Sequence, residues 1–352
     1  MSRQLTYSEA IHEAQDQCMA ADPSVIVMGL GVPDPMGIFG TTLGLQDKYG
    51  VKRVMDIPLS ENAVTGICIG AALNGIRPIL THQRLDFALV SMEQIVNQAA
   101  KWHYMFGGQA RVPMVIRMII GRGWGQGPQH SQSLHAWFAH IPGLKVIMPT
   151  TAYQAKGMLV SAIEDNNPVI SLEHRWLYGI ADNVPEEMYR VPIGKVCRLR
   201  EGRDVTLVSC SYMSLEALRA AEVLSTMGIE ADVIDLGTLR PLDEDGILQS
   251  VRKTGTLVAI DGGGVSFGVT AEILALATEK AFDTLKQAPV RIGLPDHPAP
   301  TSPALADDYY PRDAHITAAV LKMFGKPVDE SLFAKPTDRR LDQPDPSFRG
   351  PF

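Results

Sequence analysis

The sequence predicts an α/β protein built from two open, mostly parallel α/β domains in succession. The chain has 352 residues, longer than one domain of about 150 residues and sufficient for two. Short apolar segments alternate with amphipathic ones, which is typical of parallel strands joined by crossover helices. This alternation occurs in two blocks, and the stretch at 174–196 between them has no strong period.

The first block begins with a helix signal and continues as alternating strands and helices. Thr6 and Glu9 match a capping box, which predicts that a helix begins after Thr6. Segment 114–120 is apolar at almost every position, so we expect a strand buried on both faces. The clearest helix is expected over 88–105, because its apolar residues form one stripe and a Gly-Gly pair follows it. The remaining elements expected here are strands at 24–28, 53–57, 78–81, 145–148 and 169–172, and helices at 61–74 and from 151.

The second block repeats the alternation and sets the predicted domain limits. We expect a first domain at 1–180, a linker at 181–196, a second domain at 197–325 and a proline-rich tail at 326–352. The tail has five prolines and little periodicity, which favours a loose tail over an ordered arm. The elements expected in the second domain are strands at 205–209, 231–236, 256–260 and 290–294, and helices at 215–227, 244–253 and 271–282.

Composition and charge disfavour several classes of protein. With 32 basic and 39 acidic residues, the net charge is −7, which is not the footprint of a nucleic-acid-binding protein. No apolar run approaches the roughly 20 residues of a membrane span, so we expect no membrane association. The first ten residues lack the apolar core of a signal peptide. Four scattered cysteines favour reduced thiols in a cytoplasmic protein and disfavour a zinc site.

Two glycine-rich stretches invite comparison with nucleotide-binding loops. The glycines at 121–127 recur at every second residue, whereas the dinucleotide fingerprint needs G-x-G-x-x-G at the start of a helix. The stretch at 262–268 fails the same test, and neither stretch continues into the Lys-Ser/Thr of a phosphate-binding loop. We therefore expect permissive turns near a site, and we disfavour a Rossmann dehydrogenase.

Two residues are candidates for chemistry by type and position. Glu61 follows a predicted strand where a helix begins, and open α/β sheets bind ligands at the carboxyl ends of their strands. The spacing leaves open whether Glu61 is a helix-start residue favoured by the helix dipole or a functional acid. His130 ends the first glycine-rich loop, where it would transfer protons or precede a helix capped by Ser131. His135 and His140 are expected to be structural.

Several segments match one family when they are taken in order: Asp56 to Glu61, Gly66 to Pro78, Gln94 to Lys101, Gly107-Gly108, Gln129 to Gln132, Pro142 to Val146, Ser161 to Val169, Thr238 to Pro241, Phe267 to Val269 and Ala271 to Ile273. Together they resemble the β subunits of thiamine-diphosphate-dependent 2-oxo acid dehydrogenases, the decarboxylating components of the pyruvate, branched-chain and acetoin enzymes. The resemblance covers roughly residues 5–324. It implies a transketolase-like fold, with a thiamine pyrimidine-binding domain before a transketolase C-terminal-type domain.

The resemblance also implies roles for individual residues. Glu61 matches the glutamate that contacts N1′ of the aminopyrimidine and starts a proton relay to the reacting carbon, and burial should raise its pKa. Phe87 matches the aromatic residue that packs on the pyrimidine, and Gln83 stands at another pyrimidine contact. His130 matches the loop histidine that serves proton or acyl transfer to lipoamide. Positions that ligate structural potassium in some members correspond to Met114, Ala162, Ile163, Asp165 and Asn167.

A missing motif implies a partner. The family binds the diphosphate of its cofactor through Mg²⁺ and a Gly-Asp-Gly motif, which does not occur in this sequence. The resemblance therefore implies an α subunit that holds Mg²⁺ and the phosphates, an α₂β₂ assembly, a small 2-oxo acid substrate and docking to a lipoyl acyltransferase core. Two other functions are kept as alternatives. One is a lipoyl-independent split transketolase-like transferase or decarboxylase subunit, and the other is a non-catalytic assembly partner.

The sequence departs from the family at four places, one of which is Asp261, where the family commonly has Glu. The usual acidic pair after the first strand is missing in the run 29–32, and the tail after Phe324 is long, which puts standard docking in doubt. His82 and Arg84 replace more apolar residues. They would bind a second anionic group on a larger substrate, or else belong to a salt network within a loop.

Overall fold

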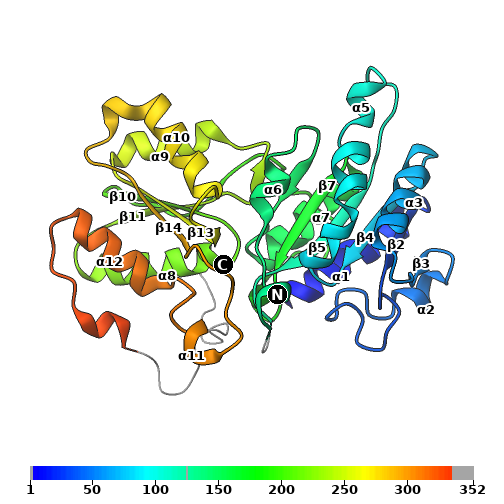
Figure 1. The fold of residues 1–352 in the computed structure, drawn as a ribbon, viewed down its shortest axis with the longest axis horizontal. Helices are drawn as coiled ribbons and strands as arrows, with labels where there is room; N and C mark the ends of the chain where they lie inside the picture. Colours follow the sequence, from blue (N-terminus) through cyan, green and yellow to red (C-terminus); the bar gives the residue numbers. More distant parts are fainter. Residues whose placement is uncertain (1–2, 124–125, 335–352) are drawn as a thin grey trace.

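The protein folds into two α/β lobes that lie side by side (Figure 1). The computed structural model describes residues 3–123 and 126–334. A seven-stranded sheet forms the centre of the first lobe, a five-stranded sheet forms the centre of the second, and a two-stranded sheet joins β1 to β8. The predicted pair of open α/β sheets is therefore confirmed.

The first sheet has the strand order β12-β6-β7-β5-β4-β2-β3, and every neighbouring pair is parallel except β12 with β6. All six residues of β5 and of β7 are buried, as expected for strands covered on both faces. The strands of this lobe are β1 (Gln4–Thr6), β2 (Val25–Gly29), β3 (Val54–Met55), β4 (Arg77–His82), β5 (Val115–Ile120), β6 (Lys145–Ile147), β7 (Val169–His174), β8 (Ala181–Asn183) and β12 (Thr238–Arg240).

Helices cover both faces of this sheet. The capping box of Thr6 and Glu9 starts the first helix as predicted. Successive residues of one strand belong to different apolar clusters: Ile79 shares a cluster with residues of the helices at 7–21 and 152–164, and Leu80 shares one with residues of the helix at 61–73. The helices are α1 (Tyr7–Ala21), α2 (Leu45–Tyr49), α3 (Glu61–Leu73), α4 (Leu85–Ala88), α5 (Trp102–Met105), α6 (His135–Ala139) and α7 (Ala152–Glu164), with short turns η3 (Pro128–His130) and η4 (Arg175–Leu177).

The helix predicted over 88–105 is irregular. The chain passes from α4 through a 3₁₀ turn, η1 (Leu89–Ser91), and a π-helical segment, η2 (Gln94–Ala99), before α5. The apolar stripe predicted a helical path correctly, because Ile95 and Ala99 are buried. A stripe of side chains does not fix which carbonyl each backbone N–H binds, so the change of hydrogen-bond register was not predictable from it.

The second sheet has the order β14-β13-β10-β11-β9, with only β9 antiparallel to its neighbour. Helices α9 and α10 cover one face, and α8 and α12 cover the other (Figure 1). The strands are β9 (Cys197–Arg200), β10 (Val205–Ser209), β11 (Ala231–Asp235), β13 (Leu257–Gly264) and β14 (Val290–Leu294). The helices are α8 (Tyr212–Thr226), α9 (Glu244–Thr254), α10 (Val269–Ala281), α11 (Pro303–Ala306) and α12 (Asp313–Met323), with turns η5 (Phe282–Thr284) and η6 (Glu330–Phe333).

Contacts of several kinds join the two lobes. Strand β12 comes from the second half of the sequence but pairs with β6 in the first sheet. Arg122 donates to the backbone carbonyls of Pro300 and Thr301. His135 on α6 and Asp261 on β13 form a buried hydrogen bond with an Nε2–Oδ2 distance of 2.8 Å. The lobes are thus cross-linked by backbone pairing and by buried polar contacts.

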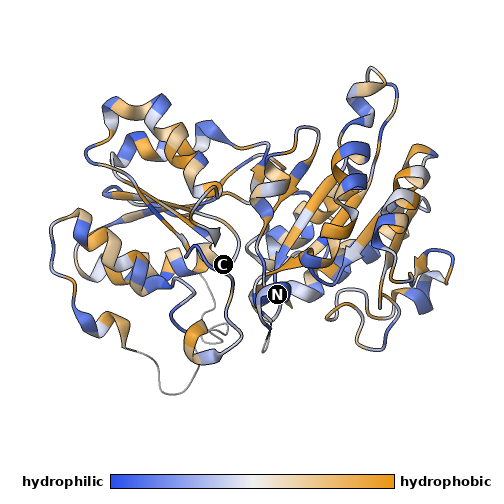
Figure 2. Ribbon diagram, in the orientation of Figure 1, coloured by the Kyte–Doolittle hydropathy of each residue, from blue (hydrophilic) through white to orange (hydrophobic). Residues whose placement is uncertain are grey.

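Apolar residues gather on the strands and on the inner sides of the helices (Figure 2). Within the segment predicted as linker, residues 181–183 form β8, and the buried amine of Lys156 binds the carbonyls of Pro185, Glu186 and Glu187. Of the tail predicted at 326–352, η6 is described and residues 335–352 lie outside the described part. No helix among the described residues is long and apolar enough to span a membrane.

Candidate active site

The predicted site residues lie at the carboxyl edge of the first sheet. Glu61 is the first residue of α3, just after β3, and Gln83 follows β4 directly. Phe87 lies on α4, and His130 ends η3 in the loop that follows β5. All four residues therefore lie near the edge where open sheets bind ligands.

The structure brings Phe87 and His130 into direct contact. Their ring centroids are 5.5 Å apart in an edge-to-face arrangement. Next to them, Gln132 donates its amide to Asp86 Oδ1 at 2.8 Å. The loop after β5 is thus attached to α4 through two neighbouring contacts. His130 itself is exposed, which leaves its ring accessible to a ligand.

Glu61 and Gln83 lie on the same edge, and within the described residues neither forms a hydrogen bond with Phe87 or His130. Gln83 donates its amide to the carbonyl of Leu30 at 3.0 Å, which fixes the side chain between β2 and β4. Glu61 is half-buried, not buried as expected, because it is the first residue of a surface helix. Among residues 3–123 and 126–334 its carboxylate accepts no hydrogen bond. Both oxygens are therefore available to a ligand.

The cap predicted at Ser131 is wrong. Helix α6 begins at His135, and its N-cap is Leu134. Ser131 is buried, and its hydroxyl has no hydrogen-bond partner within the described residues. The spacing between Ser131 and the next apolar residues was compatible with an earlier helix start, but residues 131–134 are not helical. The alternative interpretation of His130 as a helix-start residue loses its support.

His82 and Arg84 are both buried. Burial lowers the pKa of the His82 imidazole to about 4, and its Nε2 has no partner among the described residues, so the ring is neutral at pH 7. Arg84 donates from Nη1 to the carbonyl of Gly121 at 2.5 Å. Neither residue forms an ion pair in the described part of the chain. A salt network within a loop is therefore not what the structure shows.

The five residues predicted as potassium ligands surround one turn, which joins α7 to β7. Arg77 donates to the carbonyls of Ile163 and Asp165 at 3.0 and 2.9 Å, and Lys145 pairs with the Asp165 side chain. The carbonyl of Met114 accepts from Val169 N at 3.0 Å. A cation at this turn would share its carbonyl ligands with Arg77, so we derive no step through potassium. The other predicted ligands in the turn are Ala162 and Asn167.

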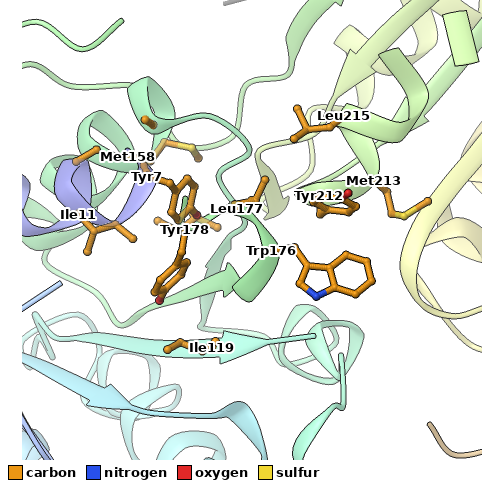
Figure 3. Packing of buried hydrophobic residues seen from close by; sticks show 14 of the residues in the cluster. Tyr7, Ile11, Ile119, Met158, Trp176, Leu177, Tyr178, Tyr212, Met213 and Leu215 are labelled. Atoms are coloured by element: carbon orange, nitrogen blue, oxygen red, sulfur yellow. The ribbon is translucent and has the colours of Figure 1, made fainter. Parts of the chain in front are cut away.

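Sequence reasoning missed an aromatic and cationic cluster at the seam between the lobes. Trp176 packs against Tyr212 of the second lobe, with ring centroids 5.0 Å apart (Figure 3). His174 stacks on the same tyrosine, with ring centroids 5.3 Å apart. Burial, aided by the charges of Arg312 and Arg84, lowers the pKa of His174 to about 3. A run of aromatic residues after a strand was the available signal. Within the described residues, no group of three or more histidine, cysteine or acidic side chains could hold a metal ion.

Comparison with known proteins identifies the family. The family models "Transketolase, pyrimidine binding domain" and "Transketolase, C-terminal domain" match residues 3–180 and 194–316. Among solved structures, "Split gene transketolase, inactive beta4 tetramer" has a TM-score of 0.75 and covers 90% of this chain and 97% of its own. At 24% sequence identity, that likeness shows the fold.

Curated relatives align with this chain along almost their whole length. The β subunit of acetoin:2,6-dichlorophenolindophenol oxidoreductase from Cupriavidus necator is 46% identical over 332 residues, 92% of this chain and 98% of the relative. The pyruvate dehydrogenase E1 β subunit of Rickettsia felis is 41% identical, covering 91% of this chain and 98% of the relative. The mouse mitochondrial E1 β subunit is 42% identical, covering 91% and 90%. The predicted resemblance is confirmed: the chain belongs to the transketolase-like family that includes the β subunits of pyruvate dehydrogenase E1 and of acetoin oxidoreductase.

Proposed function

We propose that this chain is the β subunit of a heteromeric thiamine-diphosphate-dependent 2-oxo acid dehydrogenase. The observation that supports this most directly is the arrangement at the sheet edge: a Glu61 carboxylate without a hydrogen-bond partner in the described part of the chain, together with the Phe87–His130 pair. The family relationship supports the same function. The cofactor, when bound, would supply an acidic ring carbon that adds to the oxo group once it is deprotonated, and its ring would take up the electron pair left by carbon dioxide.

Each residue would contribute one task. Glu61 would exchange a proton with N1′ of the aminopyrimidine, from the N-terminus of α3, where the helix dipole favours a carboxylate. Phe87 would offer its ring to the pyrimidine, and Gln83 would present its remaining amide oxygen. His130, exposed and oriented by Phe87, would transfer a proton near the reacting carbon. None of these roles needs a group outside the four predicted residues.

Exposed apolar side chains near the same edge support a partner subunit. Leu59, Ile67 and Val90 are apolar and 59–76% exposed, and they lie on or beside α3. Exposed apolar groups that gather beside a site are typical of an interaction surface. We infer that an α subunit covers this face, holds Mg²⁺ and the diphosphate, and forms an α₂β₂ assembly. Docking to a lipoyl acyltransferase belongs to the same proposal, as does a cytoplasmic location, which the four free thiols support.

The proposal is tested with the chain co-expressed with its α partner. We expect a complex with the mass of two α and two β chains by light scattering, cofactor binding by calorimetry, and 2-oxo-acid-dependent reduction of dichlorophenolindophenol. Acylation of a lipoyl domain supports the dehydrogenase over a lipoyl-independent transferase. A complex that binds no cofactor would instead identify a non-catalytic assembly partner and overturn the proposal.

A further inference from the structure

Two arginines stand at the carboxyl ends of neighbouring strands without an acidic partner. Arg84 follows β4, and Arg175 follows β7. Strand β5 lies between these two strands, and all three are parallel. Both arginines therefore leave the sheet at the edge where ligands bind in open α/β folds. Within residues 3–123 and 126–334, neither forms an ion pair.

Arg84 is held under the loop that leads to His130. Its side chain is 4% exposed, and Nη1 donates to the carbonyl of Gly121 at the end of β5. A Cβ on Gly123 would lie 2.3 Å from Nη2, so the loop backbone packs directly on the guanidinium. Burial, with the like charge of Arg175, lowers the pKa of Arg84 to about 10, and the charge of Asp86 opposes this. Arg84 thus remains charged at neutral pH.

Arg175 is fixed by aromatic rings, not by acceptors. Its guanidinium carbon lies 4.6 Å from the ring centroid of Phe39 and 5.1 Å from that of Tyr178. Among the described residues its N–H groups have no acceptor. The nearby carboxylate of Glu173 is already committed, since it binds Arg117 through both oxygens and accepts from the Tyr178 hydroxyl. Neither guanidinium therefore has a compensating anion within residues 3–123 and 126–334.

We propose that Arg84 and Arg175 bind a small oxyanion above the end of β5, and that this oxyanion is the second carboxylate of a dicarboxylic 2-oxo acid. Planar guanidinium groups match carboxylate and phosphoryl oxygens with paired N–H donors. The inference rests on the proposed function, which supplies the 2-oxo acid. Its link to the reacting groups is direct: Phe87, three residues after Arg84, contacts His130, and the loop that ends at His130 begins at Gly121.

The first test compares two substrates in the assembled enzyme. We expect Arg84→Met to lower the kcat/KM for 2-oxoglutarate relative to that for 2-oxobutanoate by about 10- to 100-fold, the usual effect of losing a hydrogen bond to a charged group. Arg203→Met removes an equal charge at an exposed, distant position and should leave the ratio unchanged. A ratio that is equal in the wild type and in Arg84→Met overturns the substrate assignment.

The second test measures anion binding through the Tm and needs no turnover. It therefore distinguishes a failure of this inference from a failure of the proposed function. Glutarate should raise the Tm of the wild-type complex, and Arg84→Met and Arg175→Met should each abolish the rise. Inorganic phosphate that protects through both arginines, with no effect of Arg84→Met on the substrate ratio, would identify a separate phosphate ligand and overturn the dicarboxylate. Arginine-dependent protection in a complex that decarboxylates no 2-oxo acid would support the anion site and overturn the proposed function. No protection by either anion overturns the anion site.

Discussion

At the scale of single residues, Glu61 is the group on which the proposed chemistry depends. Replacing Glu61 with Gln keeps the size and the helix start but removes the proton that the relay needs. We expect turnover to fall by about 10²–10⁴, the usual range for a positioned acid or base. Glu61→Asp should restore part of the activity. Calorimetry should show that the cofactor still binds, which distinguishes loss of chemistry from loss of binding.

The control for Glu61 is Glu187→Gln, which changes the same functional group on an exposed segment. Its turnover should equal that of the wild type. Turnover of Glu61→Gln within twofold of the wild type would refute the assigned role.

The buried His82 ring should make the free energy of unfolding depend on pH. The folded ring has a pKa of about 4, whereas the unfolded value is about 6.5. The native state therefore binds fewer protons, and the stabilisation present above pH 6.5 is lost as the pH falls toward 4. We expect His82 to account for about 2 kcal/mol of the stability lost between pH 7 and pH 5. Urea unfolding of wild type and His82→Phe at both pH values measures this difference.

The matched control is His140→Gln, because His140 is exposed. It should follow the wild-type pH dependence. If His82→Phe loses as much stability between pH 7 and pH 5 as the wild type does, His82 is not a buried neutral imidazole.

At the scale of elements, a buried ion pair joins the two central strands of the first sheet. Arg117 on β5 binds Glu173 on β7 at 2.7 and 2.8 Å, and both side chains are at most 1% exposed. Arg117→Met leaves a buried carboxylate without its partner, so we expect a loss of about 3–5 kcal/mol in the free energy of unfolding. The double variant Arg117→Met/Glu173→Gln should recover part of it. A single-variant loss below 1 kcal/mol in urea unfolding would contradict this.

The turn between α7 and β7 is where potassium would change the Tm of the protein, if it binds there. Two of its carbonyls already accept from Arg77, and a cation would add to that positive charge. If the turn nevertheless holds potassium as in some family members, 100 mM KCl should raise the Tm more than 100 mM NaCl does. An equal Tm in both salts shows that Arg77 and Lys145 alone satisfy the turn, and it removes potassium from the proposal.

Sequence patterns predicted a strand or helix well where the residues of that element themselves carry the pattern. The bounds of β10 and β14 match the expectation residue for residue, and the α7 helix begins after Thr151 as predicted. Strand β12 was not predicted, because three residues carry no periodicity and become a strand only by pairing with β6. Helix α12 was also missed.

At the scale of the whole molecule, the site could be predicted only in part. Glu61 and His130 were candidates because each follows a predicted strand, and the carboxyl ends of parallel strands share one edge. Gln83 and Phe87 were named as cofactor contacts from the family resemblance. Arg84 and Arg175 are about 90 residues apart, and their proximity results from the strand order β4-β5-β7. No sequence pattern reports a strand order. The unpaired charges were therefore visible only once the sheet was known.

The contacts across the seam predict that the two lobes unfold together. We propose lobes at 1–180 and 197–325, joined by residues 181–196, but β12 crosses this division, and His135 and Asp261 form a buried pair across it. Separating the lobes would uncover the edge of β6 and leave a buried carboxylate unpaired. Calorimetry should therefore show one transition for the full chain. His135→Ala should lower its Tm by several degrees, since it removes a partner from Asp261, whereas His140→Ala on the exposed surface should not. Two wild-type transitions more than 10 °C apart would mean that each lobe is stable alone and that the seam contributes little to folding.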